Sequence, residues 1–160
     1  MISRDLRVPV PIFVKKYFEG EYGTDECGRV FADKASVLGK VVNAMLVDFP
    51  HEIEARRVSG NCLTIRYVYR SKTSCIPTWK IDHLAMLLRE IFDSALIIEA
   101  RTLHENTGRY DRAVGAFLAR YGIEVDVDIQ QDAARSIYRN YLVRIEKKRA
   151  DAHYKEKKLA

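Results

Sequence analysis

The side chains best suited to a chemical role are the basic residues near the C-terminal end, because lysine and arginine are the usual partners of phosphate groups. Between Arg139 and Ala160 stand eight lysines and arginines against three acids, so this segment carries the whole net charge of +5. Such a segment attracts polyanions by releasing their counterions, and it also keeps a terminal helix solvated. The candidate phosphate contacts are Arg135, Arg139, Arg144, Lys147, Lys148 and Arg149.

Two amide side chains in the same region, Gln131 and Asn140, have the groups that pair with adenine edges. Carboxylates crowd the start of the region, where they complement a helix dipole but would meet phosphates in a DNA groove. These acids are Glu124, Asp126, Asp128 and Asp132. The pattern therefore favours phosphate contacts further along the helix over base reading at its beginning.

A second basic set lies in residues 52–70, which predict a β-hairpin around Ser59-Gly60-Asn61. Apolar and polar residues alternate in the second strand, so one face carries Arg66 and Arg70, near Arg56 if the register allows. A wing that grips a phosphate backbone has this pattern, and so has an ordinary solvated face of a sheet. Both interpretations stay open.

No residue set matches a catalytic or metal-binding motif. The three cysteines, Cys27, Cys62 and Cys75, are widely spaced and suit buried free thiols better than a zinc site or disulfides. The pair Gly39-Lys40 lacks the other glycines of a phosphate loop, which favours close helix packing at Gly39. We therefore expect a protein that is not an enzyme and that has no metal site and no cofactor.

Several elements must position these residues. The prolines of "RVPVP", residues 7–11, predict an edge strand or an extended arm. Helical spacing predicts a short helix from Ile12, which closes at Gly20 and Gly23, and a second helix over residues 34–47. The intervening "TDECGRVFAD" is expected to be a loop.

A long helix after Pro77, capped by Thr78 and running to about His104, is expected to organise the core. Its expected buried residues are Leu84, Leu88, Ile91, Phe92 and Ala95. The stretch "AFLARYGIEVDVDIQQDAARSIYR", residues 116–139, then predicts two helices. Gly122 stops the first with a left-handed backbone, Ile123 and Val125 fill the corner, and Asp126 or Asp128 caps the second. The stretch fits a helix-turn-helix or two helices packed at a corner.

Length and composition fit one folded domain, because 160 residues with 48% hydrophobic and 31% charged side chains suffice for a buried core. No apolar run is long enough to span a bilayer, and the first residues lack the layout of a signal peptide, which predicts a cytoplasmic protein. The fold class expected is α+β: a mostly helical single domain over residues 1–145, followed by a basic extension over residues 146–160. It comprises an extended N-terminal arm, the 52–70 hairpin and a helical part over residues 78–145 that ends in a basic helix.

The segments "VPVPIFVKKYFEGEYG", "LGK", "LTIRYVYR" and "AVGAFLARYGIEVDVDIQQDAARSIYRNY" resemble small, largely uncharacterised proteins encoded by bacterial prophages and mobile elements. The resemblance spans most of the chain. It implies a context only, namely a bacterial cytoplasm, or host cytoplasm for a phage protein, with DNA-handling neighbours.

These features together predict a non-enzymatic nucleic-acid-binding protein, with DNA as the preferred partner. It would act as a regulator or replication accessory of a phage or mobile element, and a homo-oligomer is compatible with this role. The alternative is a protein-interaction or virion-assembly module whose basic end aids solubility or docks an acidic partner. A nuclease or other nucleic-acid enzyme is a third alternative.

Overall fold

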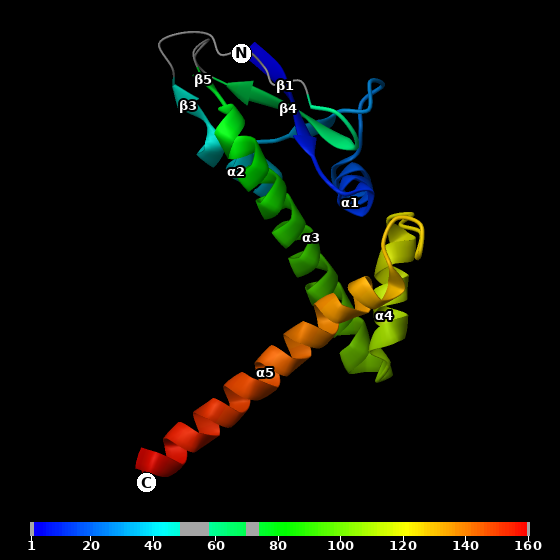
Figure 1. The fold of residues 1–160 in the computed structure, drawn as a ribbon, viewed down its shortest axis with the longest axis vertical. Helices are drawn as coiled ribbons and strands as arrows, with labels where there is room; N and C mark the ends of the chain where they lie inside the picture. The colour runs from blue at the N-terminus through cyan, green and yellow to red at the C-terminus, as the bar shows by residue number, and fades with distance from the viewer. Residues whose placement is uncertain (1, 49–57, 70–73, 160) are drawn as a thin grey trace. The chain divides into compact units, whose positions relative to one another are not determined.

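The computed structural model describes residues 2–48, 58–69 and 74–159. The fold is α+β and mostly helical, as the sequence predicts, and it comprises two compact units, Met1–Phe92 and Asp93–Ala160. Figure 1 shows a small sheet with its helices in the first unit and helices alone in the second. The expected C-terminal extension over residues 146–160 begins inside the last helix of the second unit.

A three-stranded sheet lies in the first unit, and its strands follow the order β1 (Ile2–Pro9), β4 (Cys62–Tyr69) and β2 (Val30–Ala32). Strand β1 runs antiparallel to β4, with Pro9 opposite Cys62, whereas β2 runs parallel to β4. The predicted edge strand is therefore confirmed for residues 7–9, where Pro9 ends β1, whereas Val10 and Pro11 lie after it. A separate antiparallel pair is formed by β3 (Val47–Asp48) and β5 (Ser74–Cys75).

The alternation in β4 is confirmed, because Leu63, Ile65, Tyr67 and Tyr69 are buried and the residues between them are half-buried. The first strand of the predicted hairpin, residues 52–57, lies outside the described residues, and so does Arg70. Among the described strands, the neighbours of β4 are β1 and β2. The loop prediction for "TDECGRVFAD" is wrong at Val30–Ala32, which forms β2.

Helices α1 (Ile12–Tyr22) and α2 (Val37–Met45) belong to the first unit, and α1 packs against β2 and β4. Helix α1 ends at Gly23, whose φ of 70° is in the left-handed region that glycine adopts readily. The backbone NH of Gly39 donates to the side chain of Ser36, the N-cap of α2. A Cβ at Gly39 would overlap the carbonyl oxygen of Asp33, so the close approach expected there exists, but the neighbour is the backbone segment before α2 rather than a packed helix.

Helix α3 (Thr78–Thr107) contributes residues 78–92 to the first unit and residues 93–107 to the second. Leu84, Leu88 and Phe92 are fully buried, as predicted, whereas Ile91 and Ala95 are only partly buried. The ring of Phe92 lies 5.1 Å from that of Phe13 and 5.6 Å from that of Tyr17. An aromatic cluster thus joins α3 to α1 in the core of the first unit.

The second unit contains the C-terminal half of α3 together with α4 (Tyr110–Arg120) and α5 (Gln131–Leu159). Each helix gives apolar side chains to one core. These are Leu96 and Ala100 from α3, Ala113, Val114, Phe117 and Leu118 from α4, and Ala134 and Tyr138 from α5. None of the helices in the described ranges has a stretch that is both long and apolar enough to cross a membrane.

Replacing Phe92 with alanine should lower the free energy of unfolding by roughly 3 to 5 kcal/mol, because it leaves a cavity among buried rings. Urea denaturation measures the loss. The control is Ile98→Ala on the same helix, where the side chain is 68% exposed and the expected change is within about 0.5 kcal/mol. Equal effects of the two substitutions would contradict this core.

Candidate nucleic-acid interface

The end of α4 sets where the connection to α5 begins. Gly122 has a φ of 62°, which confirms the predicted left-handed stop. Its NH donates to the carbonyl of Ala119, and the NH of Ile123 donates to that of Leu118 at 2.9 Å. These two bonds form a Schellman motif, with Ile123 buried as its apolar contact. Val125, which was also expected to fill the corner, is instead exposed.

Two carboxylates hold the connection that follows. Asp126 accepts a hydrogen bond from the backbone NH of Gln131 at 3.1 Å, and Asp128 accepts one from that of Glu124 at 2.8 Å. Asp126 therefore caps α5, and Asp128 closes the loop. Because α4 ends at Arg120 and α5 begins at Gln131, the connection is longer than the three- or four-residue turn of a helix-turn-helix. Two helices packed at a corner describe the segment better.

The first basic residues of α5 are engaged within the second unit. The guanidinium of Arg135 lies 3.1 Å from the carboxylate of Asp111 on α4, and the side chain is partly buried. Arg139 is exposed and donates to the hydroxyl of Ser136 at 2.8 Å. A phosphate would have to compete with Asp111 for Arg135, whereas Arg139 remains accessible.

The middle of α5 carries the accessible positive charge. Arg144 has Lys147 and Lys148 three and four positions after it and Asn140 four positions before it, so the four side chains share one side of the helix. All four are exposed, and Arg149 follows them. Among the residues that the structure describes, Arg144, Lys147, Lys148 and Arg149 form no ion pair. We call Arg144, Lys147 and Lys148 the basic side of α5.

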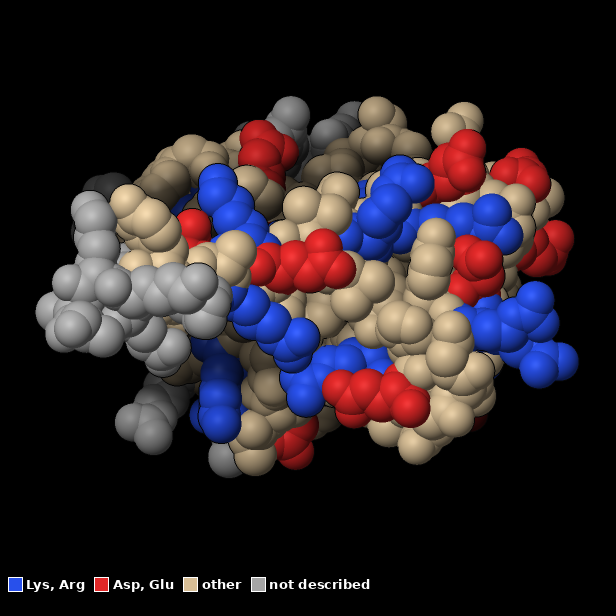
Figure 2. Space-filling view, turned by 90° about the horizontal axis from the view of Figure 1, so that it is seen from below, with Lys and Arg blue, Asp and Glu red and all other residues tan. Residues whose placement is uncertain are grey.

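Figure 2 shows one face of the molecule, where Lys and Arg side chains alternate with Asp and Glu rather than forming a continuous basic surface. The two amides considered for base reading do not act together. Gln131 and Asn140 are nine positions apart, about two and a half turns, which places them on opposite sides of α5. Only Asn140 lies on the basic side.

The arginine predicted on the strand face is bonded to carboxylates. Arg66 lies 2.9 Å from Asp5 on β1 and 3.8 Å from Asp25, and Arg29 contacts the same two acids at 3.1 and 2.8 Å. The hydrogen bond from Arg66 lowers the pKa of Asp5, and the opposing effect of burial is smaller. Two arginines and two aspartates make a neutral cluster, so Arg66 offers little charge to a phosphate.

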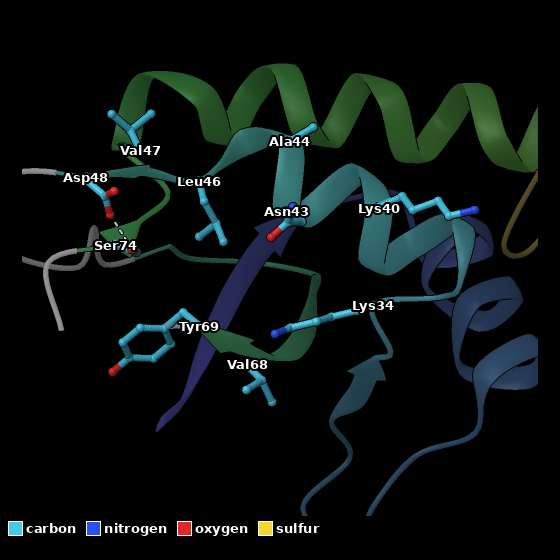
Figure 3. A pocket seen from close by; sticks show the side chains of 10 residues that line it. All are labelled: Lys34, Lys40, Asn43, Ala44, Leu46, Val47, Asp48, Val68, Tyr69 and Ser74. Atoms are coloured by element: carbon cyan, nitrogen blue, oxygen red, sulfur yellow. Dashed lines mark hydrogen bonds between the residues drawn. The ribbon is translucent and has the colours of Figure 1, made fainter. Parts of the chain in front are cut away.

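A cleft of about 560 Å³ in the first unit was not predicted from the sequence. In Figure 3, the Lys34 ammonium and the Asn43 amide point into it, whereas Lys40 points away. At one end the hydroxyl of Ser74 donates to the carboxylate of Asp48. The residues that line the cleft come from three segments, 34–48, 68–69 and 74, so their spacing along the sequence does not predict it. The mixture of charges suits a small polar ligand better than a polyanion.

The three cysteines are free thiols and differ in exposure. Cys62 and Cys75 are buried free thiols, as expected, while Cys27 is exposed. No group of three or more metal-binding side chains occurs in the part of the chain that the structure describes. The acids near α5 instead serve the loop and the helix cap.

The Schellman turn predicts opposite outcomes for two glycines. Gly122→Ala should lower the free energy of unfolding by about 1 to 2 kcal/mol, because a Cβ is strained in the left-handed region. Gly115→Ala, inside α4 and with open space for a Cβ, should raise it by roughly 0.5 to 1 kcal/mol. Thermal or urea unfolding measures both changes, and a Gly122→Ala variant at least as stable as the wild type would rule out this turn.

The charged cluster on the sheet predicts a pH dependence. Because the folded pKa of Asp5 lies below its ordinary value of 3.8, ionised Asp5 stabilises the fold above that pH. This contribution is lost as the pH falls through the lowered pKa. Asp5→Asn should therefore destabilise the protein at neutral pH, and its deficit relative to the wild type should narrow in acid. Urea midpoints of the wild type and of Asp5→Asn across pH measure this, and a deficit that stays constant as the pH falls would contradict it.

The chain was compared with protein-family models, curated proteins and solved structures. The chain matches no protein-family model, no curated protein and no solved structure.

Proposed function

We propose that the chain is a non-enzymatic nucleic-acid-binding protein, with DNA as the preferred partner, and that the basic side of α5 contacts the phosphates. The observation that carries the proposal is the exposure of Arg144, Lys147 and Lys148 without an ion pair among the described residues. Lysine and arginine in this state release counterions from a polyanion without first losing a carboxylate partner. Arg139 and Arg149 extend the contact on either side.

The charge balance of the chain supports this placement. Residues 1–138 contain nineteen basic and nineteen acidic residues, so the net charge of +5 comes from the segment that follows. Several arginines within residues 1–138 form ion pairs with acids. Arg66 lies 2.9 Å from Asp5, and Arg120 lies 3.0 Å from Glu99. The electrostatic attraction for a polyanion is therefore concentrated on α5.

Binding through these contacts should depend weakly on sequence. Phosphate contacts position a protein on nucleic acid, while base edges give sequence preference. Only one of the two amides, Asn140, lies on the basic side, and carboxylates surround the start of α5 near Gln131. The resemblance to prophage and mobile-element proteins suggests a setting for such an activity, as a regulator or replication accessory in a bacterial cytoplasm.

A second candidate function, a protein-interaction module, is favoured by one feature of the first unit. Trp79 and Met86 on α3 are 70% and 51% exposed, and their seven-residue spacing puts them on the same side of the helix. Large apolar side chains on one side of a helix are typical of protein contacts. In that case the basic end of α5 would serve solubility or contact an acidic partner.

The test replaces Arg144, Lys147 and Lys148 together with glutamine, which keeps the helix propensity similar. Each lost phosphate contact lowers the slope of log affinity against log salt by about 0.9, so the triple variant should lose roughly 2.7 units. Fluorescence anisotropy with labelled duplex DNA over a series of salt concentrations measures the slope.

The matched control replaces Arg7, Lys34 and Lys40 with glutamine, which removes the same charge from exposed positions in the first unit. This variant should keep the wild-type slope. No binding of duplex or single-stranded DNA at low salt, or the same slope for the wild type and both variants, would leave the interaction module as the better account. Mutation of Trp79 would then be the next experiment.

A further inference from the structure

A groove of about 270 Å³ lies within the second unit, between the C-terminal half of α3 and the middle of α5. Tyr141, Leu142 and Ile145 of α5 line it, and all three are half-buried. Apolar and aromatic surface is therefore accessible beside the basic side of the helix. The role proposed for the basic side does not use this groove.

The aromatic wall of the groove is held in place from behind. Tyr138 is fully buried, and its hydroxyl lies 3.1 Å from Nδ1 of His104 on α3 in a hydrogen bond. The rings of Tyr138 and Tyr141 are 5.7 Å apart and stacked at 29°. Because Tyr138 is fixed by α3, it supports the ring of Tyr141, which a ligand can reach.

The charges around the groove cancel. Arg101 lies 2.9 Å from Glu105 on one wall, and Glu146 and Arg149 lie on the other. Two cations and two anions leave no excess positive charge, so the groove does not favour a phosphate. A neutral, flat group with hydrogen-bonding edges suits it better, because the rings offer stacking and the rim offers donors and acceptors.

The groove and the phosphate-binding residues are continuous. Arg149 lines the groove and directly follows Lys148. Arg144 is three positions after Tyr141, and Lys148 is three positions after Ile145, so these two groove residues each have a basic neighbour along the helix. A nucleotide with its phosphate on the basic side therefore has its base within reach of the groove.

We propose that this groove binds an unpaired nucleobase, so that the nucleic acid recognised is single-stranded or locally opened. The inference rests on the proposed function and names its substrate class. Bases in a duplex are stacked and paired, and they reach a protein groove only after flipping out, which is unfavourable. Single strands present their bases for stacking on aromatic side chains, a mode that tolerates many sequences.

The experiment compares Tyr141→Ala with the wild type on three probes. These are a short single strand, the same sequence as a duplex, and a strand of equal length whose sugars lack bases. Tyr141→Ala should weaken binding of the single strand by about 5- to 100-fold, the loss expected from one stacking ring. Binding of the duplex and of the abasic strand should stay the same, and so should the salt slope, because no phosphate contact is removed.

Two variants separate stacking from damage to the fold. Tyr141→Phe keeps the ring and should retain most of the affinity for the single strand. Tyr154→Ala removes an exposed tyrosine of the same helix, 62% exposed and outside the groove, and should leave all three affinities unchanged. Circular dichroism of each variant checks that the helices are intact.

The outcomes distinguish this inference from the proposed function. An equal loss for the single strand and the abasic strand, or no loss with Tyr141→Ala, overturns the groove while binding through the basic side stands. A change in oligomeric state with Tyr141→Ala, without a change in affinity, would assign the groove to contacts between copies. No binding of any probe at low salt overturns the proposed function itself.

Discussion

Burial of Tyr138 is the constraint on which the candidate interface depends. Its side chain is 1% exposed, it is hydrogen-bonded to His104, and its ring also lies against that of Tyr110. A helix with Tyr138 and Ala134 in the core can adopt only one rotation about its axis, and that rotation decides which residues face solvent. Asn140 and Arg144 are exposed for this reason. Packing of one tyrosine thereby sets the direction of the positive charge.

The same rotation of α5 places basic side chains on one side of the helix and aromatic and apolar side chains on another. The side that carries Arg144 and Lys148 faces solvent, while Tyr141 and Ile145 line the neutral groove beside α3. In the first unit, by contrast, Arg66 and Arg29 form ion pairs with Asp5 and Asp25, and these stabilise the sheet surface rather than attract a ligand. Exposure of a basic residue is thus not enough for phosphate binding, because the neighbouring carboxylates decide how much of its charge remains.

Features that depend on a few adjacent residues were predicted from the sequence. Contacts between residues far apart in the sequence were not. The stop at Gly122, the cap at Asp126 and the alternation in β4 each depend on a few adjacent residues, and all three are confirmed. Strand β2 was missed because three residues show no periodicity and its parallel pairing with β4 is long-range. The neutralisation of Arg66 was missed for a related reason, since Asp5 is 61 positions away. The opposite placement of Gln131 and Asn140, however, follows from their spacing and was available from the sequence.

A structural role for the basic residues has to be weighed against a binding role. Cations near a helix C-terminus stabilise it by interacting with its dipole, and this alone would explain basic residues in the last turn. The effect falls off within that turn, whereas Arg144, Lys147 and Lys148 precede the end of α5 at Leu159 by three turns or more. From Glu146 onward every side chain that the structure describes is exposed, so packing does not account for them either. Arg144 and Lys148 lie about one turn from the groove residues Tyr141 and Ile145, and solvation of the helix alone gives no reason for that position.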